Sequence, residues 1–202
     1  MRVRPWLAFK IIVLSAIAAS GLPRAGADEP AKTQAVTAGP IKLTVPETWK
    51  KKDASNRFRL AQFTIPKAAG DAEDGEFVVF FFGAGGGGGP EANIQRWLGE
   101  FQPHDRKQKL TSGKSAQGDY ILVDLRGTWN KPIGRRIDQK TVAMPNARVL
   151  SVILTGKDQN NYFLRLTGPE KTVSANVDAL RAAIGADAKA EKDYTLPEPS
   201  AN

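Results

Sequence analysis

Short apolar segments follow one another along most of this chain, and they constrain the fold more than any other feature. "IKLTV", "RFRLAQFTI", "EFVVFFF", "DYILVDLRG", "ARVLSVILTG" and "NYFLRLTG" are rich in Val, Ile, Leu, Phe and Tyr. Runs of this kind, bounded by proline, glycine and polar residues, are typical of β-strands. "EFVVFFF" is apolar throughout, which indicates a strand buried on both faces. With "KLTSGK" as a further candidate, we predict six or seven strands.

Two segments have helical periodicity instead. "PEANIQRWLGEF" has Pro90 in its first turn, and its apolar residues from Ile94 to Phe101 recur with helical spacing. "EKTVSANVDALRAAIG" carries a second apolar stripe and closes with Gly185 as a C-cap. The order β-β-β-α-β-β-β-α with hairpin-like connections predicts an antiparallel sheet packed by two main helices, an α+β domain. Trp49 and Trp97 are assigned to its core.

The first 27 residues have the layout of a secretory signal peptide. Basic residues precede an apolar stretch from Ile11 to Ala19, and a small-x-small site ends at Ala27 before Asp28. The apolar stretch is shorter than the about 20 residues that span a bilayer. We therefore expect a signal peptide over 1–27 and an exported, periplasmic or extracellular protein without a membrane span after its removal. The alternative is an uncleaved amphipathic helix or membrane anchor.

The remaining chain is expected to form one domain with a flexible segment on either side. Residues 28–39 are small and polar, and residues 186–202 are charged and poor in large apolar side chains. Such composition is typical of disorder. We predict a flexible lead-in over 28–39, a single α+β domain over 40–185 and a disordered tail over 186–202. We expect this protein to be a monomer.

Net charge and cysteine content exclude several functions. The formal net charge is +8, but four basic residues lie in the predicted signal peptide, so the exported chain would carry +4. No block of lysine and arginine is long enough for a nucleic-acid-binding arm, and we expect no nucleic-acid partner. The chain has no cysteine, which excludes disulfides, a thiol nucleophile and a thiolate metal site.

The order of elements resembles the Mog1/PsbP-like fold, a curved antiparallel sheet covered by helices. "VPETWK", "PNARVLSVIL" and "NYFLRLTGPEKTV" look like stretches of exported bacterial proteins, many of them from planctomycetes, that have this fold. The likeness covers most of residues 41–184. It implies a curved sheet, and it transfers no catalytic residue because the family carries no established ones.

The glycine-rich stretch "GAGGGGGP" ends a strand and precedes a helix, as phosphate-binding loops do. Gly83, Gly85 and Gly88 match G-x-G-x-x-G, but a dinucleotide site also requires a parallel β-α-β unit. Pro90 removes a backbone N–H donor, and Glu91 places negative charge at the start of the helix. We therefore predict a mobile surface loop and no nucleotide cofactor.

Neither the histidine nor the local acidic cluster predicts a catalytic or metal site. His104 is the only histidine and lies in the polar turn "QPHDRK", so a catalytic triad or a His-based zinc site would depend on it alone. The cluster "GDAEDGE", from Asp71 to Glu76, lacks the spacing of a calcium loop. We predict solvated positions for both and expect no metal.

The segment "GTWNKPIGRRIDQK" is the strongest candidate for a recognition surface. It carries Trp129, Lys131, Arg135 and Arg136 on a predicted long loop. An exposed Trp beside arginines offers apolar area together with forked hydrogen-bond donors. A protein, a glycan or an anionic polymer would suit such a surface. In the more ordinary alternative, Trp129 covers an edge of the core and the arginines are solvated.

These features predict an exported, non-catalytic binding or accessory protein. The alternative is a hydrolase that acts through paired carboxylates on the sheet face, with Glu100, Asp119 and Asp124 as candidates. A third option is a protein that binds a small apolar ligand on the aromatic-rich face of the sheet.

Overall fold

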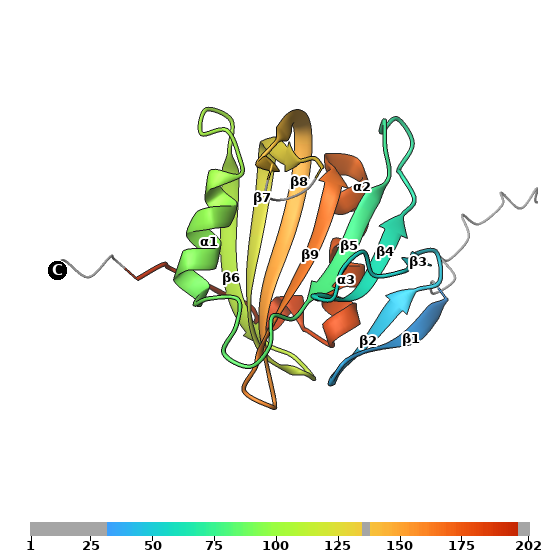
Figure 1. Cartoon of the computed structure of the whole chain (residues 1–202), viewed down its shortest axis with the longest axis vertical. Coiled ribbons are helices and arrows are strands. Elements are labelled where there is room, and N and C mark those ends of the chain that lie inside the picture. The colour runs from blue at the N-terminus through green and yellow to red at the C-terminus, as the bar shows by residue number, and fades with distance from the viewer. Residues whose placement is uncertain (1–31, 135–137, 198–202) are drawn as a thin grey trace, which may run out of the picture. The chain divides into compact units, whose positions relative to one another are not determined.

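The computed structural model describes residues 32–134 and 138–197, all within a unit that spans Ala31–Asn202. Its centre is an antiparallel sheet of eight strands (Figure 1). In spatial order these strands are β10 (Lys192–Asp193), β6 (Lys107–Lys114), β7 (Gly118–Pro132), β8 (Thr141–Gly156), β9 (Asn161–Pro169), β5 (Gly75–Phe80), β4 (Arg59–Ile65) and β3 (Lys50–Lys52). A separate two-stranded sheet consists of β1 (Thr33–Ala38) and β2 (Ile41–Pro46).

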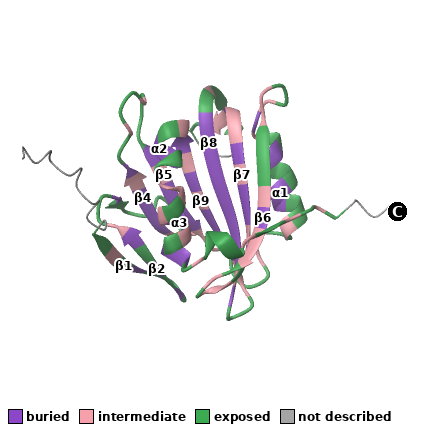
Figure 2. Ribbon diagram, turned by 180° about the vertical axis from the view of Figure 1, so that it is seen from behind, coloured by how far each residue is buried: buried purple, intermediate pink, exposed green. Residues whose placement is uncertain are grey.

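Helices cover the two faces of the large sheet unequally. Helices α2 (Glu170–Ser174) and α3 (Val177–Ile184) lie on one face (Figure 2), where they and the β1–β2 hairpin enclose the larger apolar cluster. Helix α1 (Pro90–Gly99) lies on the opposite face, near β6 and β7 (Figure 1), and packs on a second apolar cluster. The strand β5 contributes to both faces, because Phe77, Val78 and Val79 are each at most 3% exposed. Its predicted burial on both faces is confirmed only in part, since Glu76 and Phe80, on the same face as Val78, are partly exposed.

The α+β class and the antiparallel sheet are confirmed, but the count of elements differs from the prediction. The large sheet has eight strands, whereas six or seven were predicted, because the short edge strands β3 and β10 lack an apolar pattern. The segment 41–45 was placed in the main sheet, but it pairs with β1 instead. The second predicted helix divides at Asn176, whose Nδ2 donates to the Thr172 carbonyl and whose Oδ1 accepts from Trp49 Nε1.

The predicted flexible lead-in is wrong for the part that the structure describes. Residues Thr33–Ala38 form β1 and pair in register with β2 from Pro46 to Ile41. Val36 and Ala38 are buried in the larger cluster. The segment looked too polar for a strand because only one of its faces is apolar. The predicted signal peptide, with Ala27 and Asp28, lies outside the described residues. None of the described helices is long and apolar enough to cross a membrane.

The predicted disordered tail is also wrong as far as Pro197. Strand β10 pairs with β6, and the buried carboxylate of Glu191 accepts hydrogen bonds from Arg181, Thr111 and Tyr120. Burial acts to raise the pKa of Glu191, but these hydrogen bonds outweigh it and hold the pKa below its ordinary value. The carboxylate of Glu191 is therefore the anchor that orders the tail, although the composition of the tail is typical of disorder.

The glycine-rich loop precedes α1 as expected, and its backbone requires glycine. Gly83, Gly85, Gly87 and Gly88 all have positive φ, a region that other residues adopt with difficulty. Its closing carbonyls, those of Gly87 and Gly89, accept hydrogen bonds of 2.8 and 2.9 Å from Asn93 Nδ2. Asn93 thus fixes this end of the loop against α1.

Candidate functional site

One face of the eight-stranded sheet is divided into two halves of different chemistry. Residues opposite each other on neighbouring strands point to the same side of a sheet. On the side of α1, strands β7, β8 and the adjoining part of β9 present mainly apolar residues, here called the covered half. They are Ile121, Val123, Leu125, Val149, Ser151, Ile153 and Phe163.

The other half of this face, here called the open half, continues the same rows across β9, β5, β4 and β3. One row contains Thr167, Glu76, Thr64 and Lys50, and the next contains Arg165, Val78, Gln62 and Lys52. Seven of these eight residues are polar or charged. No described helix covers them from the side that carries α1 (Figure 1). The row pattern thus changes from apolar to polar where the cover of α1 ends.

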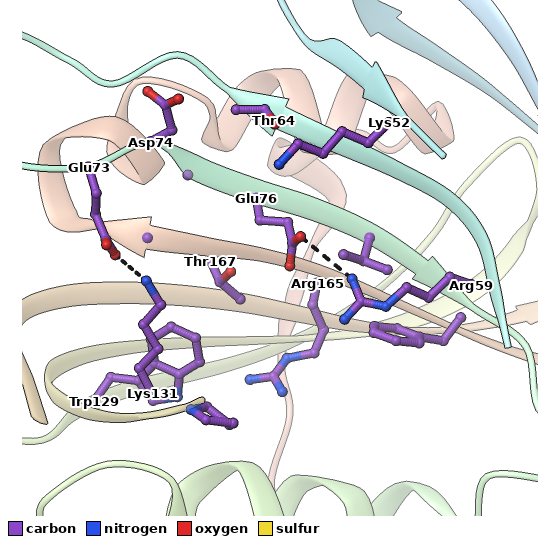
Figure 3. Close-up of a pocket in the computed structure, with 15 residues that line it drawn as sticks. Lys52, Arg59, Thr64, Glu73, Asp74, Glu76, Trp129, Lys131, Arg165 and Thr167 are labelled. Atoms are coloured by element: carbon purple, nitrogen blue, oxygen red, sulfur yellow. Dashed lines mark hydrogen bonds and ion pairs between the residues drawn. The ribbon is translucent and has the colours of Figure 1, made fainter. Parts of the chain in front are cut away.

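A pocket of about 370 Å³ lies over the open half (Figure 3). Strands β4, β5 and β9 form its floor, and the end of β7 forms one wall with Trp129, Lys131 and Pro132. The connection between β4 and β5 contributes Glu73 and Asp74. Four cationic and three acidic side chains line the pocket together: Lys52, Arg59, Lys131, Arg165, Glu73, Asp74 and Glu76.

Glu76 is the central carboxylate of the pocket floor. Its Oε1 accepts a hydrogen bond of 2.6 Å from Gln62 Nε2 and lies 3.5 Å from Arg59 Nη1. The Arg59 guanidinium also lies over the ring of Phe80, with its Cζ 5.2 Å from the ring centroid. Figure 3 shows the Arg59 and Glu76 side chains meeting over the floor. This geometry holds one cation and one anion side by side in the pocket.

Glu100 connects the pocket to helix α1. Its two carboxylate oxygens accept hydrogen bonds from both terminal nitrogens of Arg165, at 3.1 and 2.6 Å. The same carboxylate accepts a hydrogen bond of 3.1 Å from Trp129 Nε1. Arg165 also lies over the ring of Trp97, with its Cζ 5.7 Å from the ring centroid. The Glu100–Arg165 pair therefore stands at the boundary between the covered and open halves.

The predicted recognition loop is mostly a strand where the structure describes it. β7 continues through a bulge between Gly127 and Trp129 and pairs with β8 as far as Pro132. Trp129 is only 6% exposed and belongs to the second apolar cluster, so it does not offer the exposed ring of a recognition surface. Lys131 pairs with Glu73 in the pocket wall. Arg135 and Arg136 lie outside the described residues.

Several polar atoms of the pocket residues are buried without a hydrogen-bond partner among the described residues. They are Nε and Nη1 of Arg59, Oγ1 of Thr64 and Nε of Arg165. Ser151, which lies opposite Arg165 on β8, has an unpaired Oγ as well. Buried polar groups are nearly always hydrogen-bonded, so each exception calls for an explanation. Their concentration on one face marks the open half as the candidate functional site.

The structure does not bring together the carboxylates named for a hydrolase. Asp124 accepts two hydrogen bonds from Arg148, which also bonds Ser174 of α2, so this pair lies on the opposite face from Glu100. Asp119 is exposed near the start of β7. These three residues therefore do not form the paired carboxylates that the hydrolase alternative requires.

The remaining sequence candidates lie apart from one another. The His104 side chain is 70% exposed, as predicted for a solvated turn. The acidic cluster is distributed among separate partners: Asp71 accepts from the backbone N–H and hydroxyl of Thr172, and Asp74 accepts from the Lys67 N–H. Within residues 32–134 and 138–197, no three His, Cys, Asp or Glu side chains are grouped as metal ligands.

The sequence alone does not predict the open half as a site, for a definite reason. Alternation along β5 and β9 shows that Glu76 and Arg165 point away from Phe77 and Leu166, which face the larger cluster. It does not show which part of the opposite face α1 covers. The polar residues at alternate positions of three strands were the available signal, and they become a site only when β4, β5 and β9 are neighbours.

No family model matches the chain, and no curated protein matches it in sequence. Among solved structures, the chain is similar to the Pseudomonas aeruginosa protein PA94, whose function is unknown. That likeness has a TM-score of 0.41 and 14% identity, and it covers 83% of this chain and 99% of PA94. The chain is also similar to the PsbP protein of the cyanobacterium Synechocystis sp. PCC 6803, CyanoP, with a TM-score of 0.44 and 12% identity over 84% of this chain and 96% of CyanoP. A PsbP protein is thus among the structures that this chain resembles, while planctomycete origin and export stay predictions.

Proposed function

We propose that this chain is an exported, non-catalytic binding protein and that the pocket over the open half is its binding site. The observation that carries this proposal is the set of buried polar atoms on Arg59, Thr64 and Arg165 that make no hydrogen bond among the described residues, on three residues that line the pocket. An unmet buried polar group costs about 1–3 kcal/mol. A ligand that supplies partners to these atoms, with a small movement of the side chains that bury them, would therefore be bound favourably.

The composition of the open half supports binding in preference to a purely structural role. Val78 is 3% exposed yet belongs to neither apolar cluster, and its neighbours in the row are Gln62 and Arg165. A sheet face with no function is more simply covered by an apolar helix. The pocket's volume of about 370 Å³ falls within the range typical of small-ligand sites, about 300–1,000 Å³.

The N-terminal layout supports export, and we propose that the protein acts as a monomer outside the cytoplasm. The partner classes suggested by the sequence were a protein, a glycan and an anionic polymer. The pocket now replaces the Trp129–Arg136 segment as the place where such a partner, or part of it, would bind. Trp129 and Lys131 contribute to the pocket as wall residues.

The hydrolase alternative would have to use the acidic residues of the pocket itself, Glu73, Asp74 and Glu76. Glu73 is paired with Lys131, and Glu76 with Arg59. A glycoside hydrolase needs one carboxyl group that is protonated when the substrate binds. Chemical conversion of a bound ligand would identify this alternative.

The proposal is tested by blocking the pocket. The full chain and its variants Lys52→Trp and Thr167→Trp, which add an indole to the pocket, are screened by thermal shift against peptides, saccharides, carboxylates and polyamines. The matched control is Thr44→Trp, an exposed position of β2 outside the pocket. We expect at least one compound to stabilise the unaltered chain and the control. The same compound should stabilise neither pocket variant. Equal stabilisation of folded pocket variants, or no stabilising compound at all, contradicts the proposal.

A further inference from the structure

Three ion pairs compensate most of the charges of the pocket, and this bears on the kind of ligand it takes. Glu73 pairs with Lys131, and Glu76 with Arg59. Arg165 is held at both terminal nitrogens by Glu100, which lies just behind the lining. With Glu100 counted, four cationic side chains face four carboxylates. The site therefore has no excess of either charge.

Charge compensation disfavours an ionic ligand. A carboxylate or phosphate entering the pocket would have to displace Glu76 from Arg59 or Glu100 from Arg165, and the displaced carboxylate would then be left without its partner. An uncompensated charge of this kind is strongly unfavourable in a partly buried site. An ammonium group would meet the same difficulty with Lys131 and Arg59. Lys52 is exposed and belongs to the rim.

The hydrogen-bonding capacity of the same groups remains available. An ionised carboxylate accepts about four hydrogen bonds, whereas Glu76 has one hydrogen bond and one ion pair among the described residues. Arg59 and Arg165 each have a buried N–H donor, and Thr64 a buried hydroxyl, that make no hydrogen bond among the described residues. The floor of the pocket thus offers both donors and an acceptor. A hydroxyl suits such a floor because a single oxygen both donates and accepts, whereas an amide divides the two functions between separate atoms.

The pocket also has an apolar part. Val78, Phe80, Trp129 and Pro132 line it beside the charged residues. A ligand that fits both parts carries hydroxyl groups at its edge and C–H groups on its faces. The ring of a sugar has this distribution.

Resting on the proposed function, we infer that the ligand of the open half is a neutral saccharide. Its hydroxyl groups meet Glu76, Arg59, Arg165 and Thr64, and its C–H face lies against Val78 and Phe80. The ion pairs of the pocket remain intact when it binds.

Matched disaccharides that differ in charge test this inference. Isothermal titration calorimetry with the full chain compares the neutral cellobiose, maltose and N,N′-diacetylchitobiose with the cationic chitobiose and the anionic digalacturonic acid. We expect at least one neutral disaccharide to bind about tenfold more tightly than either charged one. The Lys52→Trp variant abolishes this binding. Tighter binding of a charged disaccharide in the pocket overturns the inference but leaves the proposed function standing. The same conclusion follows if the thermal-shift screen finds a peptide or carboxylate whose binding is lost in the pocket variants alone. Binding unaffected by Lys52→Trp contradicts both.

A single uncharged substitution sharpens the test. Glu76→Gln keeps the size of the side chain and an acceptor for Gln62, but it leaves Arg59 without its carboxylate. We expect about threefold weaker binding of the neutral disaccharide and tighter binding of digalacturonic acid. Asp119→Asn makes the same change in net charge near the start of β7, about 30 Å along the strand from Trp129, and should alter neither affinity. An unchanged preference in Glu76→Gln contradicts the inference.

Discussion

The covered and open halves belong to one face of one sheet, and they share its strands and pairing. Under α1, apolar residues such as Val123 and Val149 are fully buried, and Trp97 packs on them. Beyond α1, the same rows continue with Arg165, Glu76 and other polar residues. Burial stabilises apolar surface by about 25 cal/mol per Å², whereas covering ionised groups removes their hydration at a cost. The limit of α1 therefore follows the limit of apolar surface, and what remains uncovered is a polar surface suited to a ligand.

The largest expected effect breaks the covered half. Trp97→Ala removes an indole that is 2% exposed from the interface between α1 and the sheet. We expect a loss of about 3–5 kcal/mol in the free energy of unfolding, measured by urea denaturation. Phe58→Ala, which removes an aromatic ring that is 37% exposed, is the comparison and should cost less than half as much. Equal losses would mean that the covered half is not the better-packed region.

A smaller effect is expected at the boundary between the halves. Glu100→Ala leaves Arg165 and the Trp129 N–H without their shared acceptor. Because the two side chains of the pair are 17% and 19% exposed, we expect about 2–3 kcal/mol, somewhat less than for a fully buried pair. Thermal unfolding of this variant is compared with that of Glu47→Ala, an exposed acidic residue outside the pocket. A loss no greater than that of the control would show that the two halves are not coupled through Glu100.

The C-terminal segment closes the edge of the covered half, and its anchor predicts a pH dependence. Tyr194 and Leu196 pack against the second apolar cluster, and Glu191 bonds Arg181 nearby. Since the pKa of Glu191 is lowered in the folded state, its ionised form adds stability above the unfolded pKa of about 4.3. That stability is lost as the pH falls through the folded pKa.

Glu191→Gln is therefore expected to cost about 1–2 kcal/mol at pH 7. The difference from the unaltered chain should stay constant between pH 6 and 8 and shrink below about pH 4.3. Denaturant titrations at several pH values measure it. A difference that grows on acidification would reverse the sign and refute the assignment of Glu191 as the anchor.

The smallest effect is expected in the open half. Thr64 lies on its first row with an unpaired, buried Oγ1. Thr64→Val replaces this hydroxyl with a methyl group, so we expect a change within about 0.5 kcal/mol, or a slight gain in stability. The same variant should bind the pocket's ligand more weakly. A large loss of stability would indicate that the hydroxyl has a structural role, and the contrast between the halves would weaken.

Strand and helix patterns predicted the layers of this fold well, and the reasons for the misses are local. The apolar segments 57–65 and 161–168 located β4 and β9, and helical spacing after Pro90 located α1. β1 and β10 were missed because their order depends on partners outside each segment: β1 pairs with β2, β10 pairs with β6, and Arg181 holds Glu191. Composition describes a segment by itself and cannot include such partners.

The recognition loop illustrates the same limit at the level of the site. Trp129 and Lys131 were chosen for residue type, and both do line the pocket. Trp129 nevertheless serves as a buried wall, because the segment continues β7 and places Trp129 on the same side of the strand as Leu125, where the second cluster lies. Residue type indicated a place of interest, while the direction of the side chain depended on the segment being a strand and not a loop.

The sequence by itself determined the α+β class, the antiparallel pairing and the positions of α1 and of most strands of the large sheet, because composition and periodicity are local properties of the chain. Only the tertiary structure decided that Arg59, Glu76 and Arg165 meet in one pocket. They come from three strands, and the chain makes β4, β5 and β9 neighbours through long-range pairing. It also decided where α1 stops, and with that which polar residues stay open to a ligand.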